Sequence, residues 1–140
     1  MTKNISPITA CITCQYDVVT VYNILVVEDD VLIGMLLTEM LTELGHVVCA
    51  VERTEAGAVA AATRRHPDLM IVDANLNEGS GISAVETILK DKFIPHVFVT
   101  GDKRGTQLLR PGDVVIEKPF REMDLVNAMT RALANGQKNP

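Results

Sequence analysis

Residues 69–81, LMIVDANLNEGSG, join an apolar run to a polar, glycine-rich segment. The four residues before Asp73 are all large and apolar, and two of them are β-branched. A short apolar run bounded by polar residues is typical of a strand that is buried on both faces, as in a parallel sheet. A carboxylate at the end of such a strand lies close to the protein interior, so its position calls for a chemical explanation.

The rest of the chain alternates between this strand pattern and helical patterns. Strand-like runs lie at residues 22–27, 46–51, 69–73, 96–100 and 113–117. Apolar residues at helical spacing lie in residues 31–44, 54–66, 82–89 and 120–135. This alternation predicts a parallel sheet with helices on both faces, and right-handed crossovers leave few topologies. We therefore predict an α/β fold: a flavodoxin-like, doubly wound, five-stranded parallel sheet in the order 2-1-3-4-5, with its functional crevice at the carboxyl ends of the strands.

Local signals predict where several helices begin and end. Asp30 and Thr54 are suited to cap helix N-termini, and Gly45 and Gly136 are suited to end helices. The fourth crossover, residues 101–112, offers only one pair of leucines, and glycine and proline interrupt it. We expect at most about two helical turns in that crossover, and therefore a shortened fourth helix.

The length and charge of the chain limit the class of protein. Its 140 residues suggest one domain, which we assign to residues 21–135, with a flexible N-terminal extension at 1–20 and a C-terminal tail at 136–140. No apolar run approaches the ~20 residues that a membrane span needs, so we expect a cytoplasmic protein without a membrane partner. The net charge is −5 and no cluster of lysine or arginine is present, which argues against nucleic acid as a direct partner.

The cysteines and histidines give no metal or disulfide pattern. Three cysteines are an odd number for a disulfide framework. Cys11 and Cys14 have redox spacing, but they precede a strand, whereas a redox pair should open a helix. His46, His66 and His96 stand at the boundaries of predicted elements and lack metal-ligand spacing. We expect solvated or capping roles for the histidines and no role for the cysteine pair.

Polar residues stand at the ends of four predicted strands: Glu-Asp-Asp at 28–30, Asp73, Thr100 and Lys118. Taken singly, each is more often a helix cap, a turn residue or a solvated loop residue. In a parallel sheet, however, the carboxyl ends of the strands share one edge. Carboxylates on neighbouring strand ends repel one another unless a cation lies among them. Hard oxygen ligands with open positions for water favour Mg²⁺.

A bound divalent ion would make Asp73 a credible nucleophile. A carboxylate can attack a phosphoryl donor in line and form an aspartyl phosphate. The group in transfer carries negative charge on three equatorial oxygens. Mg²⁺ could neutralise the first, the ammonium of Lys118 the second, and the Thr100 hydroxyl with a nearby backbone N–H the third. The carboxylate at the end of this strand is thus explained if it accepts a phosphoryl group.

Four stretches together resemble the receiver domain of two-component response regulators. They are ILVVEDD at 24–30, LMIVDANL at 69–76, VFVTG at 97–101 and VIEKPF at 115–120, and the similarity covers about residues 22–134. The resemblance implies that Asp73 is the phosphoacceptor, and that Thr100 and Lys118 are the switch hydroxyl and the lysine of the family. It also makes Lys118-Pro119 a candidate for a cis peptide bond.

The same resemblance implies a Mg²⁺ site. Asp29 would bind the ion directly, and Glu28 would reach it through water. Asp73 and the backbone carbonyl of Asn75 would complete the protein ligands. Asp30 is left to cap the next helix, because the acidic pair begins immediately after the apolar strand.

Two features depart from the usual receiver pattern. Receivers commonly carry an aromatic residue three positions before the lysine, where this chain has Val115, so the usual coupling of threonine and aromatic cannot operate. The fourth crossover is also short. FVTG at 98–101 is similar to the Phe-Ala-Thr-Gly motif of a subgroup of stand-alone receivers with a reduced fourth helix, which tend to act in stress signalling.

The resemblance implies a single-domain regulator, because only NGQKNP follows the last predicted helix. It would accept its phosphoryl group from a sensor histidine kinase or a histidine phosphotransfer protein. It would then bind a downstream protein target, relay the group to another histidine, or serve as a phosphate sink. Such a protein is not an enzyme: it is phosphorylated once per chain, and slow autodephosphorylation is possible.

Two alternatives stay open. A haloacid-dehalogenase-like, Mg²⁺-dependent phosphatase also uses aspartate, threonine and lysine, but it needs an acid two residues after the nucleophile, where this chain has Asn75. A receiver-like module could instead dock onto partners without being phosphorylated, which the complete set of carboxylates, Thr100 and Lys118 disfavours. Turnover of a phosphate monoester would favour the first alternative, and the absence of any acetyl phosphate adduct the second.

Overall fold

The computed structural model describes residues 20–101 and 106–138, so Cys11 and Cys14 lie outside the described part of the chain. The strands are β1 (Asn23–Val27), β2 (Val47–Glu52), β3 (Leu69–Asp73), β4 (His96–Thr100) and β5 (Val114–Glu117). The helices are α1 (Val31–Glu43), α2 (Glu55–Arg65), α3 (Gly81–Asp91), α4 (Glu122–Lys138) and the short 3-10 helix η2 (Thr106–Leu108). Among the described helices, none has the length and apolar character that a membrane crossing requires.

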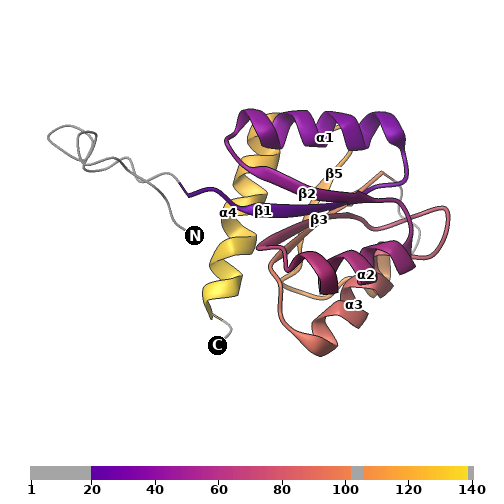
Figure 1. Ribbon diagram of the computed structural model, residues 1–140. Coiled ribbons are helices and arrows are strands. Elements are labelled where there is room, and N and C mark those ends of the chain that lie inside the picture. Colours follow the sequence, from indigo (N-terminus) through magenta and orange to yellow (C-terminus); the bar gives the residue numbers. More distant parts are fainter. Residues whose placement is uncertain (1–19, 102–105, 139–140) are drawn as a thin grey trace, which may run out of the picture.

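The five strands form one parallel sheet in the order β2-β1-β3-β4-β5, which confirms the predicted topology. Helices α1 and α4 cover one face, and α2 and α3 cover the other (Figure 1). The central strands β1 and β3 contribute buried residues to the apolar cores on both faces. Because the strands are parallel, the polar residues that follow them gather at the carboxyl edge of the sheet.

The predicted helix boundaries at Asp30, Thr54 and Gly45 are confirmed. The Asp30 carboxylate caps α1 by accepting the N–H groups of Leu32 and Ile33 at 2.9 and 3.2 Å. The Thr54 hydroxyl caps α2 by accepting a backbone N–H at 3.0 Å. Beyond α1, Gly45 has a φ of 95°, a conformation that glycine adopts without strain. The sequence therefore determines both ends of α1 locally.

Helix α4 does not stop near Gly136 but continues through it to Lys138, so the helix end predicted there is wrong. A Cβ on Gly136 would lie 2.7 Å from Cγ of Pro95. The glycine at this position therefore allows α4 to pack closely against the segment before β4. Its small size is needed for that approach, rather than its freedom to adopt positive φ.

In the described residues of the fourth crossover, the only helix is η2, a single turn of 3-10 helix. This agrees with the predicted shortening of the fourth helix. Val115 lies opposite Phe98 in the register of β4 and β5 and packs against the core beneath α2 and α3. The lost coupling between Thr100 and an aromatic residue at this position stays a prediction. The Lys118-Pro119 peptide bond is cis, as predicted.

His66 has the solvated, capping role that the sequence predicts, whereas His46 and His96 are partly buried and contact backbone groups. Nδ1 of His46 accepts the Tyr22 N–H at 3.2 Å. Nδ1 of His96 lies 2.8 Å from the carbonyl oxygen of Ile94. His66 ends α2 in the left-handed conformation, with a φ of 50°.

Candidate functional site

Three carboxylates meet where β1 and β3 end. The two strands are paired, with Val27 opposite Val72, so Glu28, Asp29 and Asp73 follow on adjacent strand ends. One oxygen of each carboxylate lies within 4.8 Å of the others. Glu28 and Asp73 are only 1% and 6% exposed, and Asp29 is half-buried. Like charges this close repel one another, so the group needs positive charge nearby.

Lys118, which follows β5, supplies one positive charge. Its Nζ lies 3.1 Å from Oδ2 of Asp73 and 3.1 Å from Oε1 of Glu28. Burial opposes the charged form of Lys118, but the charges of Asp73 and Glu28 outweigh burial and raise its pKa. The lysine stem passes beside Gly101, where an added Cβ would lie 3.2 Å from Lys118 Cδ. The ammonium is therefore held between two carboxylates that are distant in sequence.

Glu28 is a buried carboxylate with an unsatisfied oxygen. Its Oε2 accepts the Asp30 N–H at 3.1 Å. Its Oε1 receives no hydrogen bond from the described residues, because the contact with Lys118 is an ion pair without hydrogen-bond geometry. Burial raises the pKa of Glu28 to about 7; the Asp30 N–H opposes the rise, and the neighbouring Asp73 adds to it. An additional cation would relieve this unfavourable environment.

Asp73 and Thr100 lie at the ends of neighbouring strands. Oδ1 of Asp73 accepts the Asn75 N–H at 3.0 Å, while Oδ2 faces Lys118. Thr100 is 5% exposed, and its carbonyl accepts the Lys118 N–H at 2.8 Å, which ties the end of β4 to the segment after β5. The structure thus brings the three carboxylates and the Lys118 ammonium together. Asn75 joins them through its backbone N–H, and Thr100 through its backbone carbonyl.

The loop between β3 and α3 is held by contacts that the sequence does not predict. Oδ2 of Asp29 accepts the Asn77 N–H at 2.6 Å. Glu55, in the first turn of α2, accepts the Ser80 N–H at 3.0 Å and the Ser83 hydroxyl at 2.6 Å. The only signal in the sequence was a glutamate beside a helix cap, which by itself indicates no more than a helix N-terminus. Glu55 therefore anchors the loop that leads away from the site.

Glu55 should make this loop anchor sensitive to acid. Hydrogen bonds from the Ser83 hydroxyl and the Ser80 N–H hold the pKa of Glu55 below its ordinary value. A depressed pKa contributes stability above the unfolded-state pKa, and that contribution is lost as the pH falls through the folded-state value. We expect the hydrogen-exchange protection factor of the Ser80 amide, which donates to Glu55, to fall as the pH drops below the ordinary pKa range of a glutamate. In Glu55→Gln this pH-dependent step should be absent, because the glutamine amide does not titrate; a step of equal size would contradict the assignment.

The donor set and the charge of the site fit a hard divalent cation. Lys118 balances at most one of three clustered carboxylates, and one buried oxygen of Glu28 has no hydrogen-bond donor. All available ligand atoms are oxygens, which suits Mg²⁺. Glu28, Asp29 and Asp73 could hold such an ion. The backbone carbonyl of Asn75, which the family resemblance implies as a further ligand, stays a prediction.

Fold and site together define a class of protein: a doubly wound α/β domain with an acidic cation site at its carboxyl edge, closed by a lysine. Comparison with known protein families agrees with this class. The chain matches the response regulator receiver domain over residues 24–130. The chain belongs to that family.

Two curated relatives are response regulators. PhyR, the phyllosphere-induced regulator of Methylorubrum extorquens, is 36% identical over 114 residues, which cover 79% of this chain and 43% of PhyR. The transcriptional regulatory protein PdtaR of Mycobacterium tuberculosis is 30% identical over 126 residues, which cover 87% of this chain and 62% of PdtaR. The chain thus spans about half the length of these relatives.

Solved structures of PhyR share the fold. The receiver domain of Erythrobacter litoralis PhyR has a TM-score of 0.73 and 32% identity, covering 81% of this chain and 91% of that domain. PhyR of Bartonella quintana, described as an anti-anti-sigma factor, has a TM-score of 0.71 and 31% identity, covering 86% of this chain and 50% of PhyR. These likenesses confirm the receiver fold that the sequence motifs predict.

Proposed function

We propose that this receiver accepts a phosphoryl group on Asp73 and transmits a signal to other proteins. The donor would be a sensor histidine kinase or a histidine phosphotransfer protein in the cytoplasm. The output would be a phosphorylation-dependent contact with a downstream protein, or a phosphorelay. One observation carries the proposal: the buried Asp73 carboxylate lies 3.1 Å from the Lys118 ammonium and within a group of three carboxylates.

Asp73 would act as the nucleophile. One of its carboxylate oxygens attacks phosphorus and forms a new P–O bond, while the bond from phosphorus to the donor breaks and leaves its electron pair on the donor's nitrogen or oxygen. The Lys118 ammonium is close enough to neutralise one phosphoryl oxygen, and the Thr100 hydroxyl is proposed to serve another. Bound Mg²⁺ would supply further positive charge, held by the acidic group described above. The protein is modified once and does not turn over.

Acetyl phosphate and intact-mass spectrometry test this proposal. With Mg²⁺ present, we expect the chain to gain the mass of one phosphoryl group, because the donor then meets a neutralised carboxylate site. Removing Mg²⁺ with EDTA should slow formation of the adduct at least about tenfold, which corresponds to ~1.4 kcal/mol of transition-state stabilisation. A chain that stays unmodified with every donor would instead favour the docking-only alternative.

The phosphatase alternative has less support. The family match covers residues 24–130 and names a receiver domain. The position where such a phosphatase needs its general acid holds Asn75, whose amide cannot donate a proton in that role. Repeated hydrolysis of a phosphate monoester by the purified chain would revive this alternative, whereas a single phosphorylation per chain would not.

An exposed apolar surface beside the acidic site is suited to the phosphodonor. We call it the α1 patch, made of Val31, Leu32, Met35 and Leu36, which are between 48% and 77% exposed. The patch lines a hollow of about 770 Å³, and Glu28 and Asp30 also line it. Contiguous exposed apolar side chains commonly mark protein-binding sites. A donor protein bound there would bring its phosphohistidine next to Asp73.

Charge on the α1 patch should block protein donors selectively. The protein donor is the histidine kinase that phosphorylates the wild-type chain fastest. In the double variant Leu32→Glu, Met35→Glu, we expect phosphotransfer from this kinase to slow at least about tenfold, because two apolar hot-spot contacts are lost. Phosphorylation by acetyl phosphate should not change, since that donor needs no docking surface. Met123→Glu, at a 61% exposed position on α4, is the control and should leave both rates unchanged. Equal slowing with acetyl phosphate would mean that the variant damages the site itself.

A further inference from the structure

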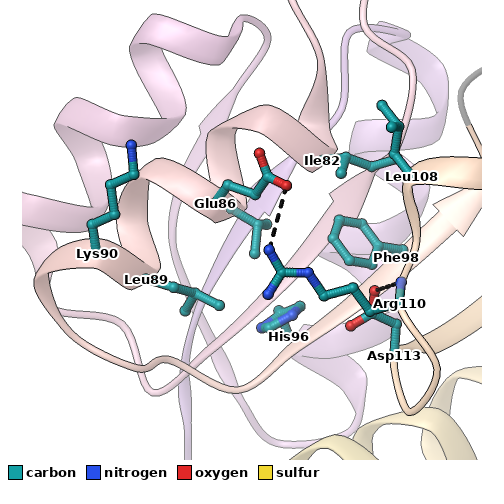
Figure 2. A pocket seen from close by; sticks show the side chains of 10 residues that line it. Ile82, Glu86, Leu89, Lys90, His96, Phe98, Leu108, Arg110 and Asp113 are labelled. Atoms are coloured by element: carbon teal, nitrogen blue, oxygen red, sulfur yellow. Dashed lines mark hydrogen bonds and ion pairs between the residues drawn. The ribbon is translucent and has the colours of Figure 1, made fainter.

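A second apolar hollow lies on the other face of the sheet, beside α3 (Figure 2). We call it the α3–β4 groove; it has a volume of about 380 Å³. Its apolar walls are Ile82, Val85, Leu89, Phe98 and Leu108. Phe98 lies at the base of the groove and is almost fully buried, whereas Leu108 at its margin is 59% exposed. An exposed leucine above a phenylalanine floor leaves apolar surface in contact with water.

The groove exists because the fourth crossover supplies no α-helix in its described part. Helices α2 and α3 form the apolar core on this face with β1, β3 and part of β4. In the described part of the crossover from β4 to β5, the three residues of η2 are the only helical ones. In a doubly wound fold both faces of the sheet are normally covered by helices. The groove therefore lies where the fold leaves room for one more helix, with α3 as its side wall.

We propose that the α3–β4 groove binds an amphipathic helix of a partner protein. The inference deepens the proposed function, on which it rests for the role of the partner, by naming the surface and the kind of partner. A helix with apolar residues at i, i+3, i+4 and i+7 would bury Leu108 and complete the layer of helices on this face. It would lie beside α3 in the position that a crossover helix takes.

The charges at the margin define the partner further. Arg110 lies 3.6 Å from Glu86 across the mouth of the groove, and both side chains are well exposed, so opening this ion pair costs little. Glu86 has an alternative cation in Lys90, one helical turn further along α3. The Asp113 carboxylate is already used by the Arg110 N–H at 2.7 Å. The Arg110 guanidinium is thus the charge that an incoming helix can use, and the helix should carry an acidic residue beside its apolar stripe.

Binding of a defined peptide to the unphosphorylated chain tests this inference. The probe is a blocked peptide of about 16 residues, or four helical turns, with leucines at i, i+3, i+4 and i+7 and glutamates beside them. We expect a dissociation constant on the order of 10⁻⁴ M. Chemical-shift changes in NMR spectra should be confined to Val85, Leu89, Phe98 and Leu108. Leu108→Glu should weaken binding about tenfold, and Arg110→Glu about fivefold.

The controls separate this inference from its rivals. Met123→Glu should bind the peptide like the wild type, and a scrambled peptide of the same composition should not bind. Shift changes on the α1 patch, or none at all, would overturn the proposal. So would self-association, measured by sedimentation, that Leu108→Glu abolishes, because the groove would then bind a second copy. If the wild-type chain is labelled normally by acetyl phosphate but does not bind the peptide, the proposed helix-binding role of the groove is refuted and the proposed function is not.

Discussion

Asp73→Asn should abolish the acetyl phosphate adduct while the chain stays folded. Asparagine has the same shape as aspartate but lacks the anionic oxygen that attacks phosphorus. Lys118 keeps an ion-pair partner, because its Nζ also lies 3.1 Å from Oε1 of Glu28. The substitution also removes one of three clustered negative charges, so no unpaired buried charge is created. Intact-mass spectrometry with Mg²⁺ should show the adduct in the wild type and none in the variant.

Asp30→Asn is the matched control for this experiment. It makes the same chemical change in the same acidic run, but Asp30 caps α1 and lies outside the carboxylate group. Asparagine caps helices about as well as aspartate, so stability should change little. The adduct should therefore form at the wild-type level. A phosphorylated Asp73→Asn chain would show that the phosphoacceptor is wrongly assigned. An Asp30→Asn chain that cannot be labelled would show that Asp30 belongs to the site.

The members of the site could be predicted because each stands at a strand end. Once the alternating strands are placed in a flavodoxin-like parallel sheet, Glu28, Asp29, Asp73 and Lys118 fall on its carboxyl edge. Asp30 could be separated from its acidic neighbours for the same reason, since a residue after the strand has a helix to cap. These inferences succeed because they depend on the spacing of apolar residues and on the order of strands and helices along the chain. They do not depend on contacts between distant side chains.

Contacts between distant segments were not predictable. Glu55 is 25 residues from Ser80 and 28 from Ser83, and no local pattern links them. Glycine is equally ambiguous in the sequence. Gly45 ends a helix with positive φ, whereas Gly136 lies within a helix because α4 packs against another segment. The difference is set by what each glycine faces, which only the structure supplies.

Gly81→Ala should be among the most destabilising single substitutions in this chain. Gly81 is the first residue of α3, and its N–H donates to the Ala74 carbonyl at 3.0 Å. An added Cβ would overlap with the carbonyl oxygen of Asp73 and would lie 2.8 Å from Cγ1 of Val72. The first of these neighbours is backbone and cannot rotate away, so α3 or the end of β3 must shift. We expect a loss of about 3 kcal/mol in the free energy of unfolding, measured with urea, and slower labelling by acetyl phosphate.

Gly34→Ala distinguishes this steric effect from the general consequences of replacing a buried glycine. Gly34 lies inside α1, and an added Cβ would be 3.5 Å from Cγ1 of Val51, which is an ordinary contact. Alanine is favoured over glycine in a helix interior, so Gly34→Ala should gain about 0.5–1 kcal/mol. The two variants therefore carry the same chemical change with opposite expected signs. If Gly81→Ala unfolds at the wild-type urea concentration, α3 can move away from Asp73 without cost, and the site does not depend on their close packing.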